Sequence, residues 1–169
     1  QMNDGRQVPF SSLSSGQQEL LPIWYFLDNL MMQDAFEVSR KNRKSPINQE
    51  RHIVYIEEPE AHLFPEAQSL LVDIMVEVIL GADKGRYLIL TTHSPYIMTK
   101  LNVLLKAGQI SRRKKRNKEL GEIVGRSTWL QVADVAALKI EDGYVKSIMN
   151  EHEELIDAQF LDKISNVTA

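Results

Sequence analysis

Two short apolar runs, at residues 53–56 and 87–90, constrain the fold of this chain most strongly. Both are rich in β-branched, aromatic or leucine side chains, which is typical of buried strands. Between them, Pro65 favours a helix start, Gly81 a helix end, and apolar residues recur at helical spacing. These are Leu70, Leu71, Ile74, Met75 and Val78. The pattern predicts an α/β fold with a parallel-sheet βαβ core and a right-handed crossover.

A long amphipathic helix is predicted ahead of this core, after a loop or short strand over residues 1–12. Ser14 with Gln17, and Ser15 with Gln18, both have the spacing of a capping box. The apolar face then comprises Leu20, Trp24, Leu27 and Met31. Pro22 is expected to kink this helix or to confine regular hydrogen bonding to the residues after it. Residues 39–50 form a predicted polar linker.

Beyond the core, Ser94 and Pro95 predict the start of a third helix that ends near Leu105. Residues 108–128 are polar and basic. Two β-prone runs follow, at 136–140 and 144–148, and the Asp-Gly pair between them indicates a β-hairpin. The tail over 151–169 is predicted to be partly helical.

The composition excludes several classes of protein. Hydrophobic residues make up 43% of the chain, the net charge is -3, and cysteine is absent, so a disulfide scaffold or thiolate metal site is ruled out. No apolar run approaches the roughly 18 residues that a membrane helix needs, because Asp73 and Glu77 interrupt the best candidate. We therefore expect a cytoplasmic protein with no membrane partner.

Polar groups stand where each predicted strand ends. Glu57 and Glu58 follow the first strand, and His93 follows the second. Ligands bind at this edge of open α/β sheets, so Glu57 is a candidate Mg²⁺ ligand and Glu58 a candidate general base. His93 is placed to donate a hydrogen bond to a phosphate. Two solvated acids and an ordinary surface histidine are the alternative interpretation.

The segment Ser14, Ser15, Gly16 and Gln17 also suits an anion. Backbone N–H groups and the positive end of the helix dipole meet a phosphate at a helix start, where a glycine permits close approach. A simple helix cap is the alternative. The remaining histidines, His52, His62 and His152, lack metal-site spacing, and no zinc site is expected.

The order of these motifs resembles that of ABC-type ATPases over about residues 10–105. Residues 13–17 match the signature motif, 53–58 the Walker B strand with its catalytic glutamate, 59–65 the D-loop, and 91–94 the switch-histidine loop. The wording Glu-Glu-Pro-Glu-Ala-His-Leu followed by Thr-His-Ser-Pro is similar to ATPases related to RecF and to the OLD nucleases of DNA repair and phage defence.

This resemblance implies a dimer closed around ATP and Mg²⁺, with a second copy of the chain as partner. Ser14 and Gly16 would contact the γ-phosphate bound to the other subunit, within a motif that includes Ser15 and Gln17. Glu57 would support Mg²⁺, Glu58 would activate water, and His93 would sense the γ-phosphate. Ala61 and His62 would lie at the dimer interface.

The sequence departs from the family pattern at two points. Glu57 replaces the commoner aspartate, which weakens the metal assignment because Mg²⁺ tolerates little geometric error. No Gly-x-x-x-x-Gly-Lys-Ser/Thr occurs among the eight glycines, so the P-loop half is missing. The implied fold is thus a partial P-loop NTPase: residues 1–110 hold the C-terminal half of the ATPase domain, and 111–169 add its basic loop, hairpin and tail.

Three consequences are expected from the missing half. Without the phosphate-cradling loop, the 169-residue chain should neither bind ATP tightly nor hydrolyse it. The P-loop strand lies beside the switch-histidine strand in related ATPases, so its loss would open a strand edge to another chain. We therefore expect the P-loop half to be supplied upstream or by a companion, or the chain to self-associate.

The function predicted is that of an ATPase acting as a dimer switch coupled to DNA or a nuclease effector. A transporter's nucleotide-binding domain and a non-catalytic interaction module with the same fold are the alternatives. The basic run at 112–118 is either a solvated loop or a contact to a phosphate backbone.

Overall fold

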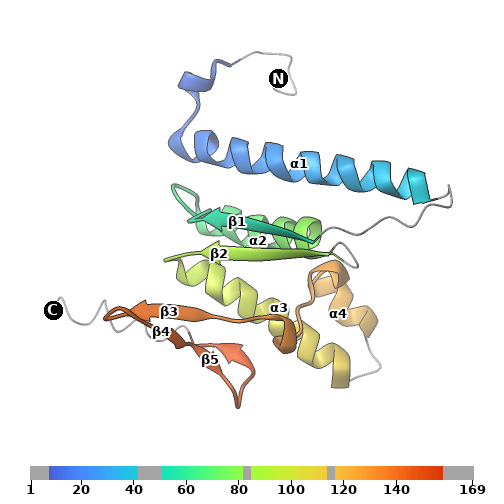
Figure 1. Ribbon diagram of the computed structural model, residues 1–169, viewed down its shortest axis with the longest axis vertical. Coiled ribbons are helices and arrows are strands. Elements are labelled where there is room, and N and C mark those ends of the chain that lie inside the picture. The colour runs from blue at the N-terminus through green and yellow to red at the C-terminus, as the bar shows by residue number, and fades with distance from the viewer. Residues whose placement is uncertain (1–7, 42–50, 82–84, 114–116, 158–169) are drawn as a thin grey trace. The chain divides into compact units, whose positions relative to one another are not determined.

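The structure is a computed structural model that describes residues 8–41, 51–81, 85–113 and 117–157. It divides into two compact units, the first formed by residues 1–68 and 78–92 and the second by residues 69–77 and 93–169. Figure 1 shows the elements. The first unit holds η1 (Phe10–Ser12), α1 (Ser15–Lys41), β1 (His52–Glu57) and β2 (Arg86–Thr91), and α2 (Pro65–Leu80) is divided between the two units. The second holds α3 (Pro95–Arg113), α4 (Asn117–Ile123), η2 (Arg126–Thr128), η3 (Val132–Asp134), β3 (Leu138–Glu141), β4 (Tyr144–Ser147), β5 (Met149–Asn150) and β6 (Leu155–Ile156).

The predicted parallel pair is confirmed. β1 and β2 are hydrogen-bonded in parallel with a register that runs from His52 opposite Arg86 to Glu57 opposite Thr91. The connection between them contains α2, which begins at Pro65 as predicted and ends before Gly81. Parallel strands need such a crossover because a tight turn reverses the chain and would make the second strand antiparallel. The first unit therefore contains a small α/β sheet.

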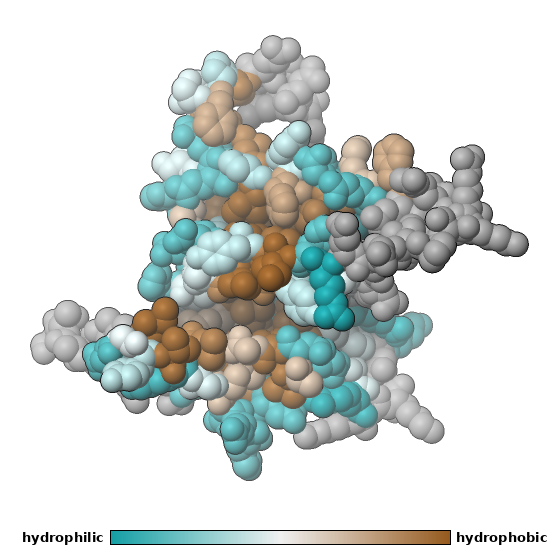
Figure 2. All heavy atoms as spheres, in the orientation of Figure 1, coloured by the Kyte–Doolittle hydropathy of each residue, from teal (hydrophilic) through white to brown (hydrophobic). Residues whose placement is uncertain are grey.

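The prediction that both strands are buried is wrong for one face of this sheet. Val54 and Ile56 are buried, whereas the alternate residues Ile53 and Tyr55 are 69% and 57% exposed. Their partners on β2, Tyr87 and Ile89, are 52% and 49% exposed. Side chains alternate between the faces of a strand, so the exposed residues share one face. Hydrophobic side chains gather over β1 and β2 in Figure 2.

The helix α1 is continuous through Pro22, so regular bonding is not confined to the residues after it. A proline removes one backbone donor, and the turns on either side of it supply the remaining hydrogen bonds. α1 includes residues 39–41, so the predicted linker starts later, and residues 42–50 lie outside the described residues. The N-terminal segment contains η1 in place of a loop or strand, and residues 1–7 are not described.

A bidentate ion pair between Arg86 and Asp34 connects elements of the first unit. Arg86, the first residue of β2, donates from Nη2 to Asp34 Oδ1 at 2.6 Å and from Nη1 to Asp34 Oδ2 at 3.1 Å. The same guanidinium donates to the Val78 carbonyl at 3.3 Å. Arginine suits this arrangement because its planar fork satisfies a carboxylate with two parallel bonds. The contact holds α1 and the end of α2 to the start of β2.

The second unit is more helical than predicted. α3 ends at Arg113 rather than near Leu105, and α4 occupies Asn117–Ile123, so most of the predicted basic loop is helix. Residues 114–116 lie outside the described residues. α3 continues because Ala107 and Gln109 are buried and extend its packed face. Gly108 is required there, since a Cβ atom would overlap the Leu130 carbonyl oxygen.

The hairpin is confirmed and the helical tail is not. β3 and β4 pair antiparallel, with Glu141 opposite Tyr144 around the Asp-Gly turn. In the described part of the tail, β6 pairs antiparallel with β5, which directly precedes the tail. Asn102 of α3 explains this outcome, because its side chain donates to the Ile156 carbonyl and accepts from the Ile156 N–H, both at 2.8 Å. The side chain replaces a strand partner and holds the tail extended; residues 158–169 are not described.

Candidate functional site

The two carboxylates stand at the end of β1, as predicted. Glu57 is its last residue, opposite Thr91, and Glu58 follows with a positive φ of 41°. A left-handed backbone is uncommon for a residue with a side chain and marks a conformation that its surroundings impose. The imposing contacts are two hydrogen bonds from the Glu58 N–H, to the Thr91 carbonyl at 3.0 Å and to Thr91 Oγ1 at 3.3 Å. Both carboxylates are exposed.

The chain then forms two successive turns, over residues 58–63, which we term the turn segment. The Ala61 N–H donates to the Glu58 carbonyl, and the Leu63 N–H donates to the Glu60 carbonyl. His62 also has a positive φ, of 55°. The Gln68 side chain donates to the Leu63 carbonyl at 2.9 Å and so closes the segment onto α2. The turn segment overlaps residues 59–65, which resemble a D-loop in sequence.

A side-chain hydrogen bond joins the turn segment to the residue after β2. The Thr92 hydroxyl donates to Glu60 Oε1 at 2.7 Å, and both residues are half-buried. Sequence reasoning missed this pair. The available signal was a polar residue shortly after each strand end, Glu60 three residues after β1 and Thr92 directly after β2, because parallel strands bring those positions to the same edge.

At the start of α1, Ser14 and Gln17 form a reciprocal capping box. The Ser14 N–H donates to Gln17 Oε1 at 3.0 Å, and the Gln17 N–H donates to Ser14 Oγ at 3.4 Å. The alternative frame does not form, because the Gln18 side chain donates to the Leu13 carbonyl instead. The cap interpretation is therefore confirmed, with Ser14 as N-cap and Ser15 as first helical residue. Anion binding at this helix start stays a prediction.

The helix start and the turn segment are in direct contact. Gly16 is buried, and a Cβ atom at this position would overlap the His62 carbonyl oxygen. His62 Nε2 also lies 3.4 Å from Glu19 Oε1, between two exposed side chains. The structure thus brings the signature-like motif beside the D-loop-like turn, two segments that are more than forty residues apart in the sequence.

His93 directly follows Thr92 and opens the second unit, where its side chain is exposed. Ser94 is buried and acts as the predicted cap of α3, since its Oγ accepts from the N–H groups of Tyr96 and Ile97 at 3.1 and 3.4 Å. The chain therefore leaves β2 through Thr92, presents His93, and immediately enters a capped helix. This arrangement restricts the backbone on both sides of the histidine.

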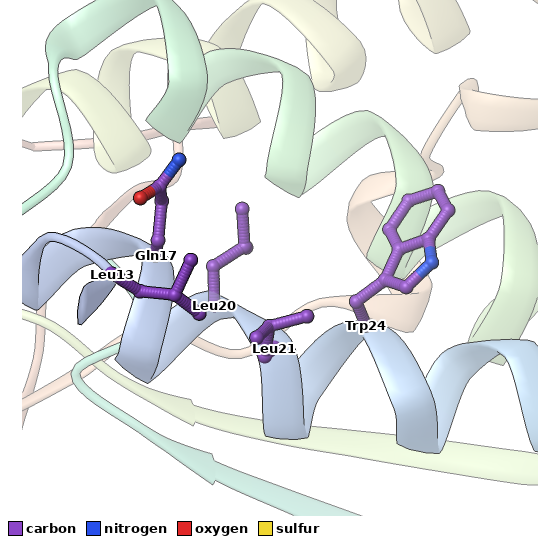
Figure 3. A pocket seen from close by; sticks show the side chains of 5 residues that line it. All are labelled: Leu13, Gln17, Leu20, Leu21 and Trp24. Atoms are coloured by element: carbon purple, nitrogen blue, oxygen red, sulfur yellow. The ribbon is translucent and has the colours of Figure 1, made fainter. Parts of the chain in front are cut away.

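A shallow apolar pocket of about 180 Å³ flanks the start of α1. It is lined by Leu13, Gln17, Leu20, Leu21 and Trp24. Figure 3 shows the side chains of Gln17, Leu20 and Trp24 on the same side of the helix. Sites for drug-sized ligands measure about 300–1,000 Å³. This pocket is smaller, and none of the predicted carboxylates lines it, so it is not a nucleotide site by itself.

The donor set at the end of β1 fits Mg²⁺ in one respect. Within the described ranges, no group of three or more histidine, aspartate and glutamate side chains is arranged to hold a metal ion. Mg²⁺ is commonly held by one or two carboxylates together with substrate phosphates rather than by an all-protein cage. The exposed carboxylate of Glu57 suits that mode of binding.

Comparison with known proteins gives one match. A family model described as an AAA ATPase domain matches residues 1–98, which include α1, β1, α2, β2 and the start of α3. No curated protein and no solved structure matches the chain. Among the described residues, no helix combines the length and hydrophobicity needed to cross a membrane.

Proposed function

Because the chain belongs to the AAA ATPase domain family, we propose that it forms part of a composite ATP-hydrolysing site. Glu58 is the general base, His93 contacts the γ-phosphate, and the start of α1 binds the γ-phosphate held by a second subunit. The observation that carries this proposal is the conformation of Glu58. Its backbone is left-handed, is hydrogen-bonded to Thr91, and leaves an exposed carboxylate at the ligand-binding edge of a parallel sheet.

The residues divide the chemistry between them. The Glu58 carboxylate accepts a proton from the attacking water, and the position of its backbone limits where that water lies. The His93 imidazole donates to a γ-phosphate oxygen. Glu57 would hold Mg²⁺ with the phosphates, and the ion would neutralise charge that develops on the transferred group. The side chain of Glu57, one methylene longer than aspartate, would reach the ion directly or through a water.

The start of α1 supplies the part of the site that acts across the dimer. The Ser14 Oγ accepts a hydrogen bond within the capping box, and its hydroxyl can still donate one to a phosphate oxygen. Backbone N–H groups of the first turn and the helix dipole add a positive potential. The contact between Gly16 and His62 makes this helix start and the turn segment one continuous surface, which suits a single partner subunit.

The proposal requires a P-loop that these 169 residues do not contain. We propose that another segment or chain supplies it and that its strand pairs with the open edge of β2. Support comes from the sheet itself, because among the described residues β2 pairs with β1 on one side and its other edge is open. The wording of the motifs further favours a RecF-like or OLD-like ATPase, in which ATP closes a dimer that acts on nucleic acid through an effector.

The dimer switch is tested with the protein expressed from its complete gene. Mg-ATP should convert the monomer to a dimer in light scattering, and Glu58→Gln should keep the dimer closed because ATP binds but is not hydrolysed. Glu122→Gln, which neutralises an exposed carboxylate of α4, is the matched control and should behave as the unmodified protein. An oligomeric state that ATP does not change would instead favour a non-catalytic interaction module.

A further inference from the structure

We infer that Thr92 and Glu60 form a positioning link that holds the catalytic turn segment to the end of β2, immediately before His93. The inference rests on the proposed ATPase function and adds two residues to it. Neither needs to touch the nucleotide. Each acts through its neighbour, because Glu60 lies two residues after Glu58 and Thr92 lies immediately before His93.

The bond between Thr92 and Glu60 is a hydrogen bond from a hydroxyl to a carboxylate. The Thr92 hydroxyl donates to the Glu60 carboxylate over 2.7 Å, and hydrogen bonds to an ionised acceptor are shorter and stronger than neutral ones. The second carboxylate oxygen of Glu60 is buried. This burial limits competition from water, which favours a defined geometry for the hydroxyl and carboxylate.

A second contact makes the link rigid. The Glu58 N–H bonds to Thr91, and the Glu60 side chain bonds to Thr92, so two residues of the turn segment are bonded to two adjacent residues at the end of β2. Two bonds between the same pair of segments prevent the rotation that one bond would permit. The turn segment therefore cannot move away from the end of β2 while both bonds are intact.

The consequence for catalysis is a kcat effect. A displacement of about 1 Å at a reacting group can cost roughly 100-fold in rate, whereas substrate affinity depends on other contacts. We expect loss of the link to lower kcat for ATP by about tenfold or more, with KM changed less than about threefold, because Glu58 is then no longer held in place against the end of β2.

The test compares variants of the protein expressed from its complete gene. Thr92→Val removes the donor at nearly constant volume, and Thr92→Ser retains it. Glu60→Met removes the acceptor, and Glu60→Asp withdraws the carboxylate by one methylene. Thr128→Val is the matched control. Thr128 is a buried residue of the second unit, and its hydroxyl donates to the Gly125 carbonyl at 2.8 Å.

The expected pattern has three parts. Thr92→Val, Glu60→Met and their double variant lower kcat by similar factors, because each removes the same bond. Thr92→Ser restores kcat to within about threefold of the unmodified protein. Thr128→Val lowers Tm without this kcat effect. Should Thr92→Val not fold, Glu60→Asp is judged by the same kcat criterion.

Two failures are distinguishable. If the unmodified protein hydrolyses ATP and Glu58→Gln abolishes this, but Thr92→Val and Glu60→Asp retain full kcat, the positioning link is refuted and the proposed function stands. If the unmodified protein does not hydrolyse ATP, the proposed function and the link that rests on it are both refuted. A loss of Tm in Thr92→Val with unchanged kcat also overturns the link, because it shows a structural role only.

Discussion

Gly16, in the first turn of α1, packs against the carbonyl oxygen of His62 in the turn segment so closely that no side chain fits between them. The contact joins a helix start suited to anions with the loop that follows the proposed catalytic glutamate. It explains why a glycine is needed at this position, independently of any approach by a phosphate. The buried environment of Gly16 agrees with this packing role.

Gly16→Ala should separate the start of α1 from the turn segment. The added methyl group meets backbone atoms, which yield less readily than a side chain, so the free energy of unfolding should fall by about 1–3 kcal/mol. Gly125→Ala is the control, because a Cβ atom there finds its nearest neighbours at 3.9 and 4.0 Å, an ordinary contact distance. Urea denaturation of both variants measures the difference, and equal stabilities would refute the close contact.

Asp34→Asn should destabilise the first unit through Arg86. The Arg86 side chain is only 8% exposed, so removal of its partner leaves a poorly solvated charge, and we expect a loss of about 2 kcal/mol. Glu154→Gln breaks the more exposed pair with Arg112 and should cost less than about 1 kcal/mol. Thermal unfolding of the two variants compares the pairs; a larger effect at Glu154 would contradict this ranking.

Glu141 should titrate far below an ordinary glutamate. Hydrogen bonds from Lys146 and then Lys139 lower the pKa of its carboxyl from 4.5 to about 2. Because the folded-state pKa is depressed, the stabilisation is complete above pH 4.5 and is lost as the pH falls toward about 2. An NMR titration of the Glu141 carboxyl measures the midpoint. Lys146→Met should raise it more than Lys139→Met, and an unshifted midpoint would show that neither ammonium group is bound.

The exposed face of the β1–β2 sheet should make the 169-residue chain self-associate. Ile89→Lys places a charge on this face and should shift the chain toward monomer in concentration-dependent light scattering. Val145→Lys is the control, because Val145 is 64% exposed on the separate β3–β4 hairpin. A monodisperse monomer before any substitution, or an equal effect at Val145, would contradict the assignment of this face.

Local patterns predicted the elements that are specified by neighbours in the sequence. Hydrophobic patterning predicted the parallel strands, and local turn and capping residues predicted three further features. These are the start of α2 at Pro65, the cap at Ser94 and the Asp-Gly hairpin. The length of α3 and the extended tail did not follow, because both depend on distant contacts. Gly108 meets the Leu130 backbone, and Asn102 binds the Ile156 backbone.

The candidate site shows the same division. Glu57, Glu58 and His93 were predicted at strand ends, and the structure places them there. The link between Glu60 and Thr92 was not predicted, because it depends on the register of two strands that are distant in the sequence and on the turn that follows β1. The exposed sheet face was not predicted either, because both strands are continuous apolar runs and do not alternate between apolar and polar side chains.

The most direct test of the central claim is the rate of ATP hydrolysis by the protein expressed from its complete gene, with and without Glu58→Gln. The account predicts a loss of roughly 10²–10⁴-fold in kcat, with ATP binding retained, because the general base is removed while the phosphate contacts remain. Hydrolysis by Glu58→Gln at the rate of the unmodified protein would contradict the account.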